Sequence, residues 1–170
     1  QNAGDGQARL QLGCLLANLG RVDEAVSLWN EAAQLNAGSI AWRNLGLVAA
    51  AKDDVQGAEQ CFRRAIAARP DDQTLYRDLA EILLVDRRRT DAIDLLETMP
   101  RQGPRRAELT VILAESYVAE ERYEKCIELL ESLPYFVNWE GQDVTWRLFN
   151  RAHVERGRRR LEQGNAEGAL

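Results

Sequence analysis

Apolar and small residues recur along the chain at helical spacing, and no segment alternates as a strand would. Small residues fall in pairs twelve positions apart: Gly13 with Ala25, Gly46 with Ala58, Ala80 with Ala92, Ala114 with Cys126, and Gly157 with Ala169. The first members of these pairs are spaced 33, 34, 34 and 43 residues apart. Such a period is typical of stacked units. It predicts pairs of antiparallel helices that cross where neither helix carries a bulky side chain, since a large residue there would overpack the crossing.

Turn and stop signals separate the predicted helices. The segment IDLLETMP at 93–100 returns as IELLESLP at 127–134, and both copies end in Pro, which cannot continue a helix. These segments are therefore predicted to be the second helices of two successive pairs. Between first and second helices, Gly20 and Gly164 mark the turn, and Asp53, Arg87 and Glu121 take its place in the other pairs. If the turn requires a positive φ, Arg and Glu carry a steric cost there that Gly avoids.

One unit, which begins with the segment WRNLGLVA, shows the whole pattern: Trp42, Leu45, Gly46, Ala58, Phe62, Ala65 and Pro70. This pattern resembles the tetratricopeptide repeat, and three other units match it in register. The resemblance implies an all-α fold, an α-solenoid of antiparallel helix pairs with about 4.5 repeats and a right-handed superhelix.

The repeats divide the chain into four predicted parts. Residues 1–5 are expected to be a leader or a cloning remnant, and residues 6–133 four tetratricopeptide repeats. Residues 134–149 are predicted to be an aromatic-rich insert with a helix extension, and 150–170 a shortened fifth repeat. The absence of an initiating Met and of a stop signal leads us to expect a piece of a longer protein. The Arg-rich composition is typical of a GC-rich genome, and we expect a bacterial protein.

The insert holds five of the eleven aromatic residues: Tyr135, Phe136, Trp139, Trp146 and Phe149. Asp143 is a plausible N-cap, which predicts one long helix over 143–162. Two interpretations of the aromatics stay open. They either cover the apolar flank of the neighbouring repeats, or some of them, Trp139 and Trp146 above all, anchor a partner, because Trp is enriched in binding hot spots.

By resemblance, the first helices line a concave groove that receives a peptide. The candidate groove residues are Gln11, Arg43, Asn44, Leu47, Arg77, Asp78, Glu81, Glu108, Ile112 and Glu115. Chaperone-binding members clamp a C-terminal carboxylate with basic residues and Asn from adjacent first helices, and Arg43, Asn44 and Arg77 supply part of that set. Asp78 stands where a second Asn is expected and should repel the carboxylate. A chaperone clamp is therefore not predicted.

Composition and charge narrow the partners. The 170 residues carry a net charge of -5, which disfavours a general binder of nucleic-acid phosphates. The runs Arg87–Arg89 and Arg158–Arg160 are flanked by acids and are predicted to be solvated faces. No apolar run approaches the roughly 20 residues of a membrane span, and no secretory signal pattern begins the chain. With only three Cys, a disulfide framework is not predicted, and we expect a cytoplasmic protein.

Catalytic and metal-ligating patterns are nearly absent. His153 is the only His and takes the slot of Trp42, so it is predicted to pack rather than react. Cys14, Cys61 and Cys126 are scattered over three units and are predicted to act as small apolar residues. No spacing fits a zinc site and no Gly-rich loop suits a phosphate, so neither a metal, a cofactor nor an enzymatic activity is predicted.

The sequence thus predicts a non-catalytic module that binds a peptide or protein in its groove. An alternative is a structural or regulatory segment of a larger bacterial protein, which could be an enzyme and whose groove is occupied in cis. RNA binding is a third reading, weakened because the groove positions differ between repeats. The open face of the fifth repeat also offers a surface for self-association.

Overall fold

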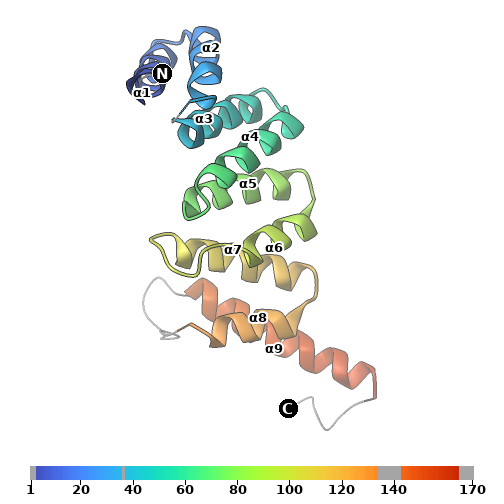
Figure 1. Cartoon of the computed structure of the whole chain (residues 1–170). Helices are drawn as coiled ribbons and strands as arrows, with labels where there is room; N and C mark the ends of the chain where they lie inside the picture. The colour runs from blue at the N-terminus through green and yellow to red at the C-terminus, as the bar shows by residue number, and fades with distance from the viewer. Residues whose placement is uncertain (1–2, 36, 134–142, 165–170) are drawn as a thin grey trace. The chain divides into compact units, whose positions relative to one another are not determined.

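The structure is a computed structural model that describes residues 3–35, 37–133 and 143–164 (Figure 1). Within these residues there are nine helices and no strand. They are α1 (Ala3–Asn18), α2 (Val22–Ala33), α3 (Gly38–Ala51), α4 (Val55–Ala68), α5 (Gln73–Val85), α6 (Arg89–Glu97), α7 (Arg106–Ala119), α8 (Tyr123–Glu131) and α9 (Asp143–Glu162). The predicted all-α helical-repeat solenoid is confirmed, and its right-handed twist stays a prediction.

The chain forms two compact units. Unit 1 comprises residues 1–88 and 99–103, and unit 2 comprises residues 89–98 and 104–170. In unit 1, each of the helices α1 to α4 packs on the next helix along the chain. In unit 2, α7 packs on α6, α8 and α9, and α9 also lies along α8 (Figure 1). Consecutive helices therefore bury one another's apolar faces, as stacked helix pairs do.

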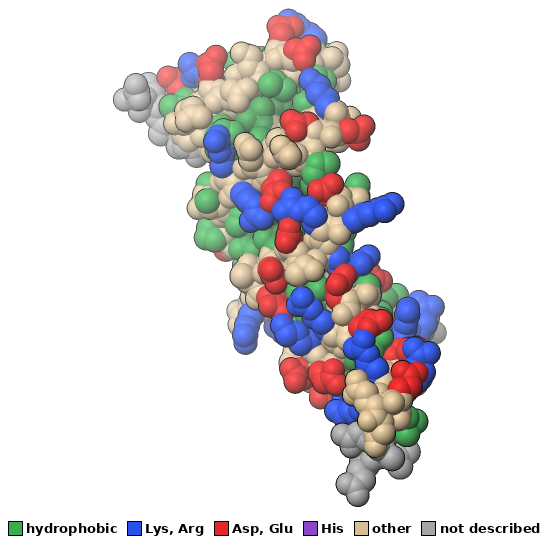
Figure 2. Space-filling model, turned by 90° about the vertical axis from the view of Figure 1, so that its right-hand side faces the viewer, with side chains coloured by type: hydrophobic (Ala, Val, Ile, Leu, Met, Phe, Trp, Pro, Cys, Tyr) green, Lys and Arg blue, Asp and Glu red, His purple; other side chains and the backbone are tan. Residues whose placement is uncertain are grey.

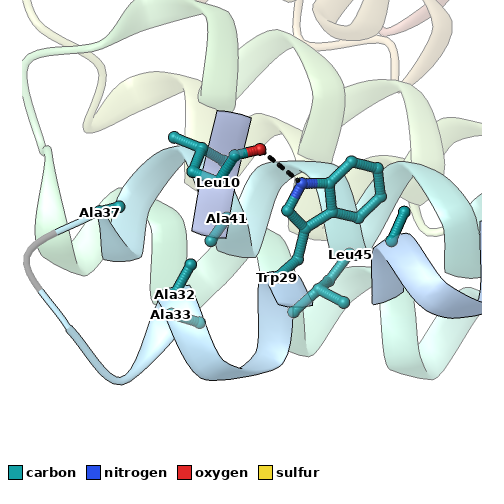
Figure 3. Close-up of a cluster of buried hydrophobic side chains, with 8 residues drawn as sticks. Leu10, Trp29, Ala32, Ala33, Ala37, Ala41 and Leu45 are labelled. Carbon is teal, nitrogen blue, oxygen red and sulfur yellow. Dashed lines mark hydrogen bonds between the residues drawn. The ribbon is translucent and has the colours of Figure 1, made fainter. Parts of the chain in front are cut away.

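The core of unit 1 shows how small and large side chains combine (Figure 3). The indole of Trp29 is buried, and its Nε1 donates a hydrogen bond to the carbonyl oxygen of Leu10 at 3.4 Å. Around it lie mostly alanines from α2 and α3, including Ala32 and Ala41, which are fully buried. One large ring thus fills the space between helices that otherwise carry small side chains.

The crossings differ in one respect from the prediction. A Cβ at Gly46 would lie 2.8 Å from Cε1 of Phe62, and one at Gly13 would lie 2.6 Å from Nε1 of Trp29. The nearest neighbour of each glycine is therefore the aromatic ring sixteen positions later, and not the alanine twelve positions later. Ala58 is fully buried, but the three heavy atoms closest to a Cβ at Gly46 all belong to Phe62. Bulky rings meet the glycines because a ring needs the space that a missing Cβ leaves.

The turns after the first helices have the positive φ that the sequence suggested. The values are 58° at Asp53, 61° at Arg87 and 56° at Glu121, beside 78° at Gly20. Each of these four turns also has a backbone hydrogen bond spanning six residues, such as Arg88 N to Leu83 O at 2.8 Å. This is the Schellman arrangement, which favours Gly at the left-handed position. Arg87 and Glu121 hold that conformation against their side-chain sterics.

We expect Arg87→Gly to stabilise the protein by about 0.5–1 kcal/mol, because relief of the left-handed strain outweighs the larger chain entropy of Gly in the unfolded state. The Arg87 side chain is exposed, so little packing is lost. Urea unfolding would measure the change. Asp53→Gly is the control and should gain less, since Asp adopts this conformation more readily than Arg. Equal or lower stability of Arg87→Gly would contradict the strain.

The first and last described helices can be compared with the boundaries predicted from the sequence. Helix α1 begins at Ala3, so the boundary predicted after residue 5 lies within its first turn. Asp5 lies in the first turn of α1, where an acidic side chain suits the helix dipole. The long helix predicted over 143–162 is confirmed as α9. Tyr135, Phe136 and Trp139 lie outside the described residues.

None of the helices over residues 3–35, 37–133 and 143–164 combines the length and hydropathy that a bilayer-spanning segment requires.

Candidate functional site

In unit 1, the first helices α1 and α3, which carry the candidate groove residues, lie side by side. Asn44 Nδ2 is 3.6 Å from Sγ of Cys14, a contact that links the two first helices. A hollow of ≈ 450 Å³ lies beside this contact, lined by Gln7, Leu10, Gln11, Cys14, Leu15, Asn18 and Ile40. Gln11 is the predicted groove residue among them. The lining combines carbon with side-chain amides, which suits a peptide better than a charged ligand.

A second hollow lies where α2 begins and α3 ends. Its volume is ≈ 430 Å³, and it is lined by Val22, Asp23, Trp29, Asn44, Leu47, Val48, Ala51 and Lys52. Lys52 and Asp23 form an ion pair of 3.7 Å, and most of the remaining lining is apolar. We call the two hollows together the α1–α3 trough. Ile40 lines the first hollow and Leu47 the second, and both side chains are partly open to solvent, at 43% and 42% exposure.

Several residues of the trough were not singled out from the sequence. Val22 and Trp29 belong to α2, the second helix of its pair, whereas the predicted groove comprised residues of first helices only. Ile40 could have been found, because it is an apolar residue one turn before the candidate residue Arg43 on α3. The hollows themselves depend on how three helices meet, which periodicity does not specify.

Next to the trough, α3 and α5 share a charged cluster. Arg43 Nε lies 2.6 Å from one carboxylate oxygen of Asp78, and Arg77 Nη2 lies 2.7 Å from the other. Arg77 Nε is also 3.7 Å from Glu81. The Asp78 side chain is only 3% exposed, whereas both arginines keep some contact with solvent. The cluster of two arginines and two acids therefore has no net charge.

The environment of Asp78 differs from that of an exposed groove residue. We expected a groove-lining carboxylate that repels another carboxylate, but Asp78 is buried and holds Arg43 and Arg77 in place. A buried carboxylate keeps its charge only when it is paired in this way. Both arginines are thereby paired within the protein, which is a second physical reason not to predict a strong carboxylate clamp.

The other three candidate groove residues lie on α7 in unit 2. Glu108 is held by Arg105 at 2.9 Å. The carbonyl oxygen of Ile112 accepts a hydrogen bond from the Ser116 hydroxyl at 2.7 Å, and the Ile112 side chain is half-buried. Glu115 is exposed. Unit 2 thus presents acidic side chains on α7, while unit 1 presents the neutral trough and the neutral cluster.

Of the two candidate aromatic anchors, Trp146 is exposed and stacks on Phe149 with 6.1 Å between the ring centroids. Phe149 in turn meets His153 edge-on at 4.4 Å. The ring of His153 therefore packs, as predicted, and its Nδ1 lies 3.0 Å from Nη2 of Arg156. The prediction for Trp139 falls outside the described residues.

The thiols have the environment of small apolar side chains. Cys126 is buried, and burial raises its pKa to about 11. Burial also raises the pKa of Cys61. A thiol with a raised pKa is a poor nucleophile near neutral pH. Within the described residues, no group of three or more Cys, His, Asp or Glu side chains is arranged to hold a metal ion.

Five of the six residues in the two arginine runs pair with acids. Arg88 hydrogen-bonds Glu59, and Arg89 hydrogen-bonds Glu120. Arg158, Arg159 and Arg160 pair with Glu155, Glu121 and Glu124, respectively. On the face shown in Figure 2, basic and acidic side chains lie interspersed. This arrangement differs from the continuous basic surface that a nucleic-acid backbone requires.

Comparison with known proteins points to one family. Two sequence models described as tetratricopeptide repeat match residues 10–73 and 49–110. A comparison with curated proteins found no match.

Among solved structures, YrrB, described as a TPR protein with an unusual peptide-binding site, superposes with a TM-score of 0.63 and 16% identity over 99% of this chain and 83% of that chain. MamA from Desulfovibrio magneticus RS-1, in a form spanning residue 41 to the end, superposes with a TM-score of 0.60 and 19% identity. The superposition covers 97% of this chain and 89% of that chain. At these identities the similarity shows the fold alone.

Proposed function

We propose that unit 1 binds a short apolar segment of a peptide or protein in the α1–α3 trough. The chain belongs to the tetratricopeptide-repeat family, whose members are protein-interaction modules. The observation that carries the proposal is the pair of hollows, ≈ 450 and ≈ 430 Å³ in volume. Each is concave, partly lined by carbon and flanked by a few polar groups, as peptide sites are. The helical repeat is a scaffold typical of non-catalytic interaction proteins.

The trough suggests the spacing of the ligand's apolar residues. Ile40 and Leu47 lie two helical turns apart on α3, which is roughly 10 Å. In a peptide with the polyproline II conformation, residues i and i+3 point to the same side and are separated by about 9 Å. We therefore expect a ligand with two apolar residues three positions apart, one for each hollow. The amides of Gln11 and Asn44 can hydrogen-bond the peptide backbone between them. YrrB, similar in fold, is itself described as having a peptide-binding site, which supports a peptide as the class of ligand.

Selected peptides can test the trough. We would isolate binders from a random peptide library on the immobilised protein, synthesise them with a fluorescent label and measure affinity by anisotropy. Leu47→Asp should weaken binding by about tenfold or more, since it places a charge in an apolar hollow. Val85→Asp is the matched control, because Val85 is a more exposed apolar residue of unit 1 and lines neither hollow.

The proposal fails if Leu47→Asp binds the selected peptides as tightly as the control Val85→Asp does. It also fails if the selected peptides share no apolar pair. A groove that selects no peptide in the isolated chain, but binds a segment joined to it in cis, would favour the alternative of a regulatory segment. Tight binding of single-stranded RNA that falls steeply with salt would favour the third reading.

A further inference from the structure

Helix α1 is apolar on two opposite sides. Leu10 faces the core of unit 1 and is 3% exposed, and α1 packs mainly on α2, with a smaller contact with α3 (Figure 1). On the other side, Leu12, Leu15 and Leu19 have exposed fractions of 49%, 61% and 73%. A helix that carries apolar residues all round is normally buried all round. We therefore expect another surface to cover the exposed side of α1.

The exposed leucines form one row with Ala8, which is also exposed. The four residues follow one another at intervals of four, three and four positions, so they lie along one side of the helix. Leu19 directly follows α1, but its backbone N donates a hydrogen bond to the carbonyl oxygen of Leu15 at 3.1 Å and so continues the helical spacing. We call these four residues the α1 row. Only Leu15 also borders a hollow of the α1–α3 trough, so the row is a separate surface.

Opposite charges stand at the two ends of the row. Asp5 lies just before it and Arg21 just after it, and their side chains are 62% and 55% exposed. Each has an acid–base partner at the surface of the chain: Arg9 is 3.9 Å from Asp5, and Glu24 is 2.6 Å from Arg21. Surface ion pairs of this kind contribute little to stability. A second molecule can therefore draw on both charges.

We propose that the α1 row binds the same row of a second copy of this chain, with the two helices antiparallel. In this register Leu12 faces the partner's Leu15, and Leu19 faces the partner's Ala8. Two-fold symmetry repeats each contact, so that every residue of the row is covered. The most exposed leucine of the row meets the smallest residue, which lets the helices approach closely.

The charges at the ends favour this direction. An antiparallel pair brings Asp5 toward the partner's Arg21, and Arg21 toward the partner's Asp5, so opposite charges meet twice. A parallel pair would place like charges together at both ends. The row is thus complementary to itself in one direction only, which makes a second copy the occupant that it fits.

The length of the row sets the expected strength of the dimer. From Ala8 to Leu19 the row extends over roughly 17 Å, which makes a small interface. We therefore expect a reversible dimer with a dissociation constant in the micromolar range or weaker. A two-fold contact closes after two chains, so no larger assembly should form through the row.

Sedimentation equilibrium of the whole chain, from micromolar to millimolar concentration, can test the row. The mean mass should rise from 19.2 kDa toward twice that value. Leu12→Ser with Leu19→Ser should weaken dimerisation by about tenfold or more, since each dimer loses four apolar side chains. The matched control is Val85→Ser with Val154→Ser, which changes two apolar residues of 79% and 67% exposure outside α1.

Charge exchange provides a second arm. Asp5→Arg and Arg21→Asp should each weaken the dimer, because like charges then meet. An equimolar mixture of the two variants should dimerise about threefold or more tightly than either variant alone, since opposite charges meet again in the mixed dimer. Asp94→Arg and Arg101→Asp are the controls, because they make the same charge changes at exposed residues outside α1, and mixing them should gain nothing. Circular dichroism would confirm that each variant is folded.

Three results would overturn the proposal: the mass of a single chain at every concentration, equal dimerisation of the α1 row variant and its control, or no gain on mixing the two charge variants. Assemblies that keep growing beyond two chains would also overturn it. Leu47→Asp should weaken peptide binding but leave dimerisation unaffected, so failure of the trough and failure of the α1 row are separate results.

Discussion

Gly46→Ala is expected to lower the free energy of unfolding by about 1–2 kcal/mol, although Ala is the better helix former by about 1 kcal/mol. The new Cβ would lie 2.8 Å from Cε1 of Phe62 and 3.0 Å from two further ring atoms. Phe62 is 1% exposed, so the ring has nowhere to move. A loss of this size should lower the melting temperature by about 2–8 °C, measured by circular dichroism.

The decisive comparison is the same substitution beside a smaller partner. In a Phe62→Leu background, Gly46→Ala should become neutral or stabilising, because the ring that blocks the Cβ is gone. The chain itself suggests this exchange. In unit 2, Ala114 stands at the position equivalent to Gly46 and Leu130 at the position equivalent to Phe62, and both are fully buried. If Gly46→Ala destabilises both backgrounds equally, the clash with Phe62 is not the cause.

Asp78→Asn is expected to destabilise the protein by about 2–3 kcal/mol, since hydrogen bonds to charged groups contribute roughly this much and the two arginines keep only part of their hydration. The substitution keeps the shape but removes the charge that holds Arg43 at 2.6 Å and Arg77 at 2.7 Å. Because the cluster is largely buried, added salt should change the effect little. Urea unfolding at two salt concentrations measures the loss of stability and its dependence on salt.

A double-mutant cycle separates this cluster from ordinary surface pairs. Asp78→Asn combined with Arg43→Gln should show a coupling of about 1 kcal/mol or more. The control pair is Arg21 and Glu24, which are 2.6 Å apart but 55% and 56% exposed, and whose coupling should stay below about 0.5 kcal/mol. Equal coupling in the two cycles would show that burial of Asp78 adds nothing.

The sequence by itself determined the repeat, the order of the helices and the turns. The recurrence of small residues gave the period, and the turn residues gave the ends of the first helices. The positive φ at Arg87 and Glu121, which the sequence raised only as a condition, is found in the structure. These features are local, because a helix face and a left-handed turn depend on residues a few positions apart. The long helix α9 followed from its N-terminal Asp143 for the same reason.

Only the tertiary structure decided which side chains meet between helices. Gly46 faces Phe62 rather than Ala58, and Asp78 turns inward to Arg43, which lies 35 positions away. The α1–α3 trough likewise depends on how three helices meet. Periodicity specifies which face of a helix is buried, but the distance, tilt and side-chain length at each contact are settled by packing all the helices together, since one large ring can take the space that several small residues leave.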